Sequence, residues 1–116
     1  MLARTNRFRG RNTLGLVFRR GVTTRSRSLA VRWLPAEGQD LRAAIVVSRK
    51  VSKSAVVRNR IRRRIYALLE QQLAKLKTGD LVVTVFEASL AEISIAELEK
   101  TLLETLKRAG AFKEPV

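Results

Sequence analysis

Apolar residues recur at helical spacing in two long stretches of the chain, and we expect both to form amphipathic helices. In residues 55–77 the apolar positions fall within one arc at about 100° per residue. The members of this arc are Val57, Ile61, Ile65, Leu68, Leu69, Leu73 and Leu76. Ser54 is placed to cap the start of this helix, and the sequence TGD at residues 78–80 is expected to end it.

The second amphipathic helix is predicted from residue 95 to about residue 108. Ser94 and Glu97 match the S-x-x-E capping box, in which the two side chains satisfy amide groups at the start of a helix. The residues predicted for its buried side are Ile95, Leu98, Leu102 and Leu106.

Before and between these helices the pattern becomes that of β-strands. The segments SLAVRWLP (28–35), LRAAIVVS (41–48) and LVVTVF (81–86) are rich in β-branched, aromatic or other apolar residues. The segment 41–48 is continuously apolar toward its end, as expected of a strand buried on both faces. Residues 22–25 could add a short extended piece, and residues 35–40 are predicted to form a polar turn.

A short helix is also predicted over residues 14–20, capped by Asn12 or Thr13 and ended by Gly21. Residues 1–11 alternate arginine with small or polar residues, and we expect an extended basic arm there. The order α-β-β-α-β-α, with one optional short strand, predicts an α/β two-layer sandwich. A chain of 116 residues suffices for one domain, 1–116.

Positive charge is concentrated in the first part of the chain. The net charge is +14, and residues 1–66 hold 18 Lys and Arg against two acids, a balance of +16. Residues 67–116 hold six Lys and Arg against eight acids, a balance of −2. Arginine supplies 17 of the 24 cations, and its guanidinium binds phosphate in bidentate fashion and stacks on bases. This distribution predicts a nucleic-acid partner.

A membrane partner is not expected. A basic helix that binds lipid needs bulky aromatic residues opposite its charges, and only 5% of this chain is aromatic. No apolar run reaches the roughly 18 residues of a membrane span, and the basic first residues lack the apolar region of a secretory signal. With no cysteine in the chain, a cytoplasmic location is the default expectation.

Several kinds of catalytic chemistry are excluded by composition. The chain has no His, which excludes an imidazole base and a His-ligated metal, and no Cys, which excludes a thiolate nucleophile. The basic half offers only Glu37 and Asp40, whereas a metal-dependent nuclease gathers several carboxylates around its metal. We therefore predict no catalytic residue and no metal site in the protein itself.

Residues 58–64 (RNRIRRR) hold five arginines on one predicted helix. With the apolar arc turned inward, Asn59, Arg60 and Arg63 project outward, Arg64 flanks them and Arg62 lies near the edge of the arc. No acid stands three or four residues from any of these arginines, so their repulsion is not relieved within the helix. A solvated helix face usually mixes both signs of charge, so this block is predicted to be an interaction surface.

The pattern favours RNA over DNA as the partner. Predicted strands flank the arginine helix, which excludes the helix-turn-helix arrangement of many DNA-binding proteins. No aromatic pair of the RNP type stands on a predicted strand, which argues against an RRM. From the residues alone, the prediction is an RNA-binding α/β domain whose contacts are mainly to phosphate.

The segment SRKVSKSAVVRNRIRRRI, residues 48–65, closely resembles the signature of the bacterial ribonuclease P protein subunit. The segments TNRF (5–8), VFRRG (17–21), AAIVVSRK (43–50) and GDLVVTVF (79–86) also occur in the order of that family, so the resemblance covers about residues 5–108. It implies a protein that binds the catalytic RNA and the 5′ leader of precursor tRNA. The RNA removes that leader by hydrolysis with Mg²⁺ that it mainly holds itself, and the protein alone is not catalytic. It also implies a left-handed βαβ crossover, formed by the R-N-R helix.

The resemblance assigns roles by position. The residues that would face the catalytic RNA are Arg58, Asn59, Arg60, Arg62 and Arg63 on the helix, with Arg49, Lys50 and Lys53 in the loop before it. The leader cleft would be lined by Leu14, Phe18, Ala30 and Arg32. The basic arm would contribute Asn6, Arg7, Arg9 and Arg11.

The chain departs from the family pattern at three positions. Aromatic residues are frequent in the family where Leu14 stands and near Arg32, so base stacking here would rely on Arg32 or Trp33. Tyr66 stands where a basic residue is frequent. Apolar helix residues such as Leu14 and Phe18 could equally be core residues.

Two other functions stay open at this point. A small basic ribosomal or ribosome-assembly protein would bind ribosomal RNA and leave precursor tRNA unaffected. A protein-only nuclease is disfavoured by the missing His and the scarce carboxylates.

Overall fold

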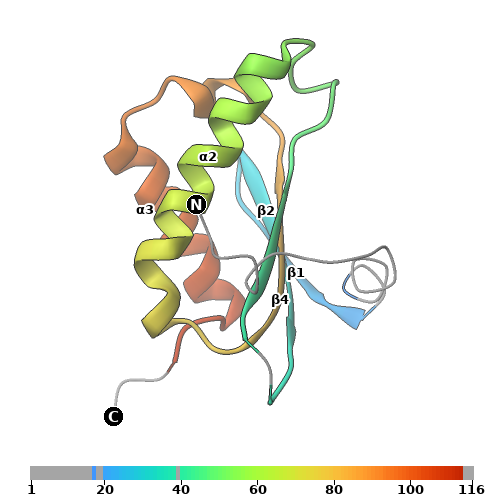
Figure 1. Ribbon diagram of the computed structural model, residues 1–116, viewed down its shortest axis with the longest axis vertical. Coiled ribbons are helices and arrows are strands. Elements are labelled where there is room, and N and C mark those ends of the chain that lie inside the picture. The colour runs from blue at the N-terminus through green and yellow to red at the C-terminus, as the bar shows by residue number, and fades with distance from the viewer. Residues whose placement is uncertain (1–16, 18–19, 39, 114–116) are drawn as a thin grey trace.

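The computed structural model describes residue 17 and residues 20–38 and 40–113 (Figure 1). Its elements are β1 (Val22–Arg25), β2 (Leu29–Pro35), β3 (Arg42–Val46), α2 (Ala55–Gln72), β4 (Gly79–Val85) and α3 (Ile95–Ala109), with the short 3-10 helices η2 (Leu73–Lys75) and η3 (Ala88–Ala91). Of the predicted helix 14–20, Val17 and Arg20 are described, and both are helical. The optional strand at residues 22–25 is present as β1.

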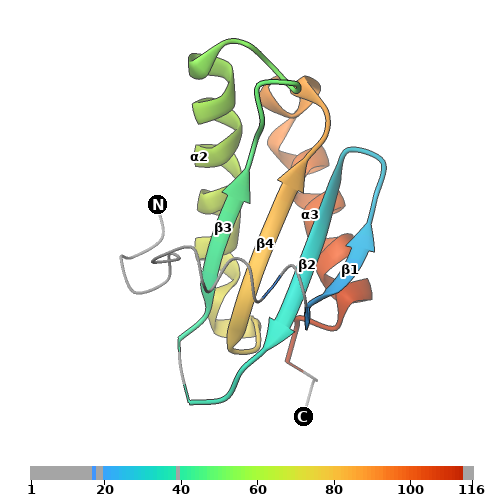
Figure 2. The ribbon, with the colours of Figure 1, turned by 90° about the vertical axis from the view of Figure 1, so that its right-hand side faces the viewer.

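The four strands form one sheet in the order β1-β2-β4-β3. β2 pairs antiparallel with β1 and with β4, whereas β3 pairs parallel with β4. Both long helices cover the same face of this sheet, and the other face is turned toward the viewer in Figure 2. The predicted α/β two-layer sandwich is therefore confirmed.

The connection from β3 through α2 to β4 is left-handed. In Figure 2 both strands point upward, the helices lie behind the sheet, and β4 stands to the right of β3. A chain that leaves β3, passes behind the sheet and returns to its right follows a left-handed path. Connections of this kind are right-handed in about 98% of cases, so this crossover is a distinguishing feature of the fold.

Alternate residues of the strands meet the helices in one hydrophobic core. On the sheet side these are Leu29, Val31, Trp33, Ala43, Ile45, Leu81, Val83 and Val85. On the helix side they are Ile61, Ile65, Leu68, Leu69, Leu98, Leu102 and Leu106. Full burial of a side chain of this size stabilises a fold by about 1.5–3 kcal/mol, so this layer holds α2 against the sheet. Four of the seven residues predicted for the first apolar arc are buried α2 residues, and Leu76 is buried just beyond the helix.

The strand buried on both faces is β4, and the prediction that residues 41–48 hold this place is wrong. β3 pairs with β4 alone among the described strands, and its residues alternate between half-buried and buried. β4 lies between β2 and β3, and six of its seven residues are buried. The half-buried residues of β3 lie on the sheet face away from the two helices, which an apolar sequence alone does not reveal.

Two helix predictions need correction in detail. α2 ends at Gln72, followed by η2, because Leu76 has extended backbone and forms a bridge with Phe112. On α3, Ile95 is 51% exposed because the first helical position points outward, and Thr105 is buried instead. The hydroxyl of Thr105 donates to the carbonyl of Thr101 at 2.7 Å, which satisfies it inside the core. The predicted caps Ser54 and Ser94 are confirmed.

Candidate nucleic-acid interface

A network of short-range hydrogen bonds fixes the start of α2 and the basic loop before it. Ser54 Oγ accepts from the amide of Val57 at 3.3 Å, and Ser52 Oγ accepts from the amide of Ser54 at 3.2 Å. The carbonyl of Ser48 accepts from the amide of Val51 at 3.1 Å, which turns the loop after β3. The first turn of α2 contains no acid, so the partial positive charge of the helix end adds to the charge of the loop.

Three of the five arginines on α2 bind carbonyl groups of neighbouring segments. Arg58 donates to the carbonyl of Ser52 at 2.8 Å. Arg62 donates to the carbonyl of Val47 at 3.3 Å and to Asn59 Oδ1 at 2.7 Å. Arg64 donates to the carbonyls of Leu90 and Ile93 in and after η3. These bonds tie the helix to the end of β3, to the loop and to η3.

Arg60 and Arg63 lie outside the buried face of the helix, which Ile61, Ile65, Leu68 and Leu69 form. Both side chains are exposed, and neither has a hydrogen bond or ion pair with any residue that the structure describes. Within the described ranges, no arginine of α2 lies within 4.0 Å of a carboxylate. The positive electrostatic potential of these five guanidinium groups is therefore not neutralised by neighbouring carboxylates, and a polyanion could neutralise it.

The predicted RNA-facing residues gather around two hollows at this end of the molecule. One, of about 700 Å³, is lined by Arg49, Lys50, Lys53, Ala55 and Arg58. The other, of about 360 Å³, is lined by Val56, Asn59, Arg62, Arg63 and Tyr66. The structure therefore brings the loop cations and the first half of α2 together, as the sequence predicted. Sequence reasoning missed Val56, which is 73% exposed among these charges.

A second predicted site, the leader cleft, is described only on its sheet side. Ala30 and Arg32 lie on the sheet face away from the helices and line a hollow of about 220 Å³ with Thr23, Arg25, Thr84 and Phe86. Ala30 is only 7% exposed, so it forms the bottom of this hollow and has little surface for contact with a ligand. The other predicted members of the cleft and the basic arm lie outside the described residues; they are Leu14, Phe18, Asn6, Arg7, Arg9 and Arg11.

The aromatic ring exposed on this sheet face is that of Phe86, whereas Trp33 faces the helices. Trp33 is 3% exposed and belongs to the core on the helix side, so the prediction that it could stack on a base is wrong. The guanidinium of Arg25 lies 4.5 Å from the centre of the Phe86 ring, and this ring is 38% exposed. Phe86 was missed because its place beside Arg25 follows from the strand order, which the sequence did not specify. For Trp33 a sequence signal was available, because Leu29, Val31 and Trp33 alternate with Ala30 and Arg32 along β2 and so share its buried face.

In the described part of the chain, three or more Asp, Glu, His or Cys side chains are nowhere grouped so that they could hold a metal ion. No helix there is long and apolar enough to cross a membrane.

Comparison with known proteins gives a consistent family. A family model described as Ribonuclease P matches residues 2–110. The chain is 47% identical over 95 residues to the Ribonuclease P protein component of Thermus scotoductus, covering 82% of this chain and 55% of that protein. It is 33% identical over 109 residues to the Ribonuclease P protein component of Streptococcus agalactiae, covering 94% of this chain and 98% of that protein. The chain thus spans about half of the first relative and nearly all of the second.

The fold has a close counterpart among solved structures. The RNase P protein of Staphylococcus aureus matches with a TM-score of 0.82 at 22% identity, covering 93% of this chain and 98% of that one.

Proposed function

The chain belongs to the ribonuclease P protein family, and from this premise we propose that its basic surface docks the catalytic RNA of a ribonuclease P. In this role the protein assists the Mg²⁺-dependent removal of the 5′ leader of precursor tRNA. The observation that carries the proposal is the division of arginines on α2. Arg58, Arg62 and Arg64 fix the helix through carbonyl groups, while Arg60 and Arg63 stay exposed.

The arrangement suits phosphate recognition. A fixed helix presents Arg60 and Arg63 with little loss of backbone freedom on binding, and each guanidinium can take phosphate oxygens in bidentate fashion. The loop cations Arg49, Lys50 and Lys53 extend the same surface beyond the start of the helix. Phosphate contacts of this kind position an RNA without reading its sequence.

Chemistry at the scissile phosphate is assigned to the RNA. The chain has no His and no Cys, and its described carboxylates do not group into a metal site, so the proposal gives its side chains a binding role. Mg²⁺ in this proposal is held by the RNA, where it would activate water and neutralise developing charge.

The sheet face with Arg25, Arg32 and Phe86 is the part of the described structure that we propose for the 5′ leader. A single strand binds where a cation and an aromatic ring lie side by side, because phosphate meets the cation and a base stacks on the ring. Substitution of Phe86 by Ser should therefore weaken binding of leader-bearing precursor more than binding of mature tRNA. Equal weakening for both RNAs would show that the leader does not bind to this face.

Reconstitution tests the proposed function. Cleavage of precursor tRNA at low Mg²⁺ is measured with the protein alone, a bacterial catalytic RNA alone, and both together. We expect cleavage to rise only when protein and RNA are combined. No gain over the RNA alone would contradict the proposal and favour a ribosomal or ribosome-assembly protein, whose binding to ribosomal RNA is measured in parallel. Cleavage by the protein alone would contradict the assignment of chemistry to the RNA.

A further inference from the structure

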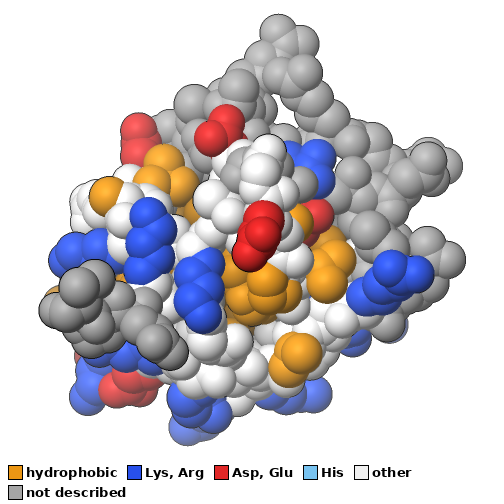
Figure 3. Space-filling model, turned by 90° about the horizontal axis from the view of Figure 1, so that it is seen from below, with side chains coloured by type: hydrophobic (Ala, Val, Ile, Leu, Met, Phe, Trp, Pro, Cys, Tyr) orange, Lys and Arg blue, Asp and Glu red, His pale blue; other side chains and the backbone are white. Residues whose placement is uncertain are grey.

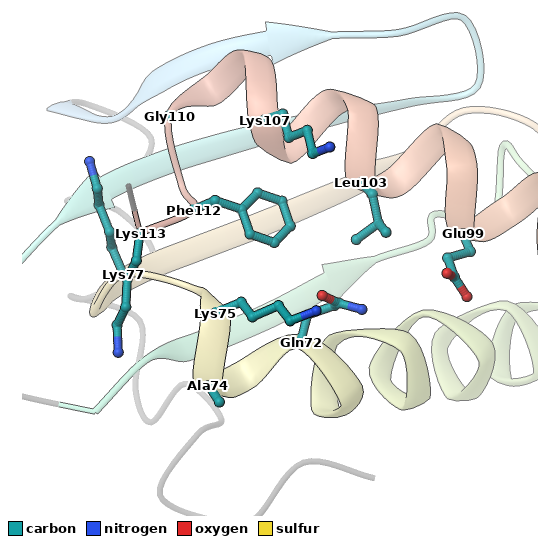
Figure 4. A pocket seen from close by; sticks show the side chains of 10 residues that line it. All are labelled: Gln72, Ala74, Lys75, Lys77, Glu99, Leu103, Lys107, Gly110, Phe112 and Lys113. Carbon is teal, nitrogen blue, oxygen red and sulfur yellow. The ribbon is translucent and has the colours of Figure 1, made fainter. Parts of the chain in front are cut away.

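A groove of about 960 Å³ lies between the C-terminal ends of α2 and α3, away from both surfaces described above. Seen from below, this end of the molecule exposes hydrophobic side chains between Lys and Arg side chains (Figure 3). The close view shows the Phe112 ring and Leu103 between the two walls, with Lys77 and Lys113 at one end and Glu99 at the other (Figure 4). Both apolar residues are half-buried and pack against the core.

The backbone along this groove is already paired. The amide of Lys77 donates to the carbonyl of Ala111, and the amide of Lys113 donates to the carbonyl of Lys75, both at 2.8 Å. Leu76 and Phe112 form the bridge between these two bonds. The bridge fixes the backbone that carries Phe112, so a partner would bind mainly to the side chains of the groove.

Those side chains are strongly positive. Four lysines line the groove, namely Lys75, Lys77, Lys107 and Lys113, and all four are exposed. They are four of the seven lysines of the chain, and the lining contains one acid, Glu99, and no arginine. Lys75 on η2 and Lys107 on α3 stand on opposite walls, one on each side of the Phe112 ring (Figure 4).

The groove does not continue the arginine surface of α2. From Arg60 to Gln72 the helix rises by about 18 Å. The exposed residues Glu70 and Gln71 lie between, so the row of cations is interrupted before the groove begins. A ligand in the groove must therefore be recognised by the groove itself.

We propose that this groove is a second RNA site, which binds a single-stranded segment. In it the ammonium groups of Lys75 and Lys107 contact the phosphates on either side of one nucleotide, whose base stacks on Phe112. Lys77 and Lys113 continue the phosphate track at one end, and Glu99 ends it at the other. The inference goes beyond the proposed function, because it requires neither the catalytic RNA nor the arginines of α2.

A single strand fits these observations better than two other anionic partners. A duplex keeps its bases stacked inside, whereas a recessed aromatic ring flanked by cations is the arrangement that binds unpaired bases. An acidic peptide strand would need free backbone groups, which the bridge has used. Lysine ammonium groups are point charges on flexible stems, so they follow a phosphate chain without fixing its sequence.

The test is a titration of the full ¹⁵N-labelled chain with a short oligouridylate, followed by amide chemical shifts. We expect shifts at residues of the groove, in addition to any at the start of α2. Phe112→Leu keeps an apolar floor but removes the ring, and it should weaken binding at the groove by about tenfold, within the range of measured base stacking. Lys107→Ala should lower the dependence of log affinity on log salt by about 0.7, the value for one contact on a single strand.

Lys100→Ala is the matched control, because it removes another exposed lysine from α3 that does not line the groove. It should leave the affinity of the groove and its salt dependence unchanged. If Phe112→Leu does not fold, the inference is tested by the groove affinity and salt dependence of Lys107→Ala compared with those of Lys100→Ala.

Three results would overturn the inference. They are shifts confined to the loop and the first half of α2, equal losses in Lys107→Ala and Lys100→Ala, and groove shifts produced equally well by an RNA duplex or by polyglutamate. A failure of precursor cleavage in reconstitution would leave this titration unaffected, so the two proposals can fail separately.

Discussion

At the scale of single residues, the block of arginines on α2 contains two kinds of side chain. Arg64 reaches Leu90 and Ile93 across the helix layer, whereas Arg60 and Arg63 are directed to solvent. The residue type and the spacing are the same in both groups. Only the neighbours that the fold supplies distinguish an arginine that stabilises the protein from one that can bind a partner.

Arg64→Ala is therefore expected to destabilise the fold. It leaves the carbonyls of Leu90 and Ile93 without their donor, which costs about 1–3 kcal/mol of unfolding free energy when such groups are partly buried. The measurement is urea denaturation. Arg63→Ala removes the same charge one residue earlier and should change the free energy by no more than about 0.5 kcal/mol. Equal losses in the two variants would show that Arg64 has no anchoring role.

Gly79 is the glycine that the sheet requires most clearly. Its φ of +156° is unfavourable for other residues, and a Cβ atom there would lie 2.6 Å from the carbonyl oxygen of Leu34 and 2.8 Å from the Trp33 ring. Gly79→Ala should lower the unfolding free energy by about 2 kcal/mol, since backbone and ring must both shift. Gly38, whose φ is +77° in open space, offers a control. Thermal denaturation of Gly38→Asn should be close to that of the native chain; a Gly79→Ala chain of equal stability would contradict the close packing.

At the scale of elements, α2 and α3 both begin with a serine N-cap, but the two caps adjoin different surfaces. Each starts at a serine whose hydroxyl accepts an amide three residues later, at 3.3 Å for Ser54 and 3.1 Å for Ser94. The cap of α2 adjoins the loop with Arg49, Lys50 and Lys53, whereas the cap of α3 follows η3 at the other side of the helix layer.

The two caps give a matched pair of variants. Ser54→Ala and Ser94→Ala should each lower the unfolding free energy by about 1 kcal/mol, the usual cost of a lost N-cap. Only Ser54→Ala should also weaken RNA binding, because it releases the basic loop. Both quantities are measured on each variant, by denaturation and by filter binding. Equal effects on binding would mean that the loop geometry does not matter for the RNA.

Much of the element pattern could be predicted from the sequence, since both caps and most of the buried face of α2 follow local rules. The errors have a common cause in tertiary structure. The edge position of β3, the central position of β4 and the end of α2 at Gln72 depend on pairing between distant segments. The basic loop and the arginines of α2 are contiguous in sequence, so this cluster could be predicted. Arg25 and Phe86 are far apart in the sequence, so their contact could not be.

At the scale of the whole molecule, the helix of the left-handed crossover, α2, connects two different surfaces. α2 carries its arginines near the end of β3, and its second half reaches the groove beside α3 (Figure 1). Within the described residues, the cations of the loop and of the first half of α2 therefore gather at one end of this helix. Binding of a polyanion would relieve the repulsion that this concentration of charge imposes on the fold.

The central claim is that Arg60 and Arg63 dock RNA through phosphate. It is tested most directly by the salt dependence of the affinity for a ribonuclease P catalytic RNA. In Arg60→Ala/Arg63→Ala, the slope of log affinity against log salt should fall by about 0.7 to 0.9 for each arginine, with the fold intact by circular dichroism. The control Arg27→Ala/Lys100→Ala removes two exposed cations elsewhere and should keep the native slope. An unchanged slope in the arginine variant, or an equal fall in the control, would contradict the claim.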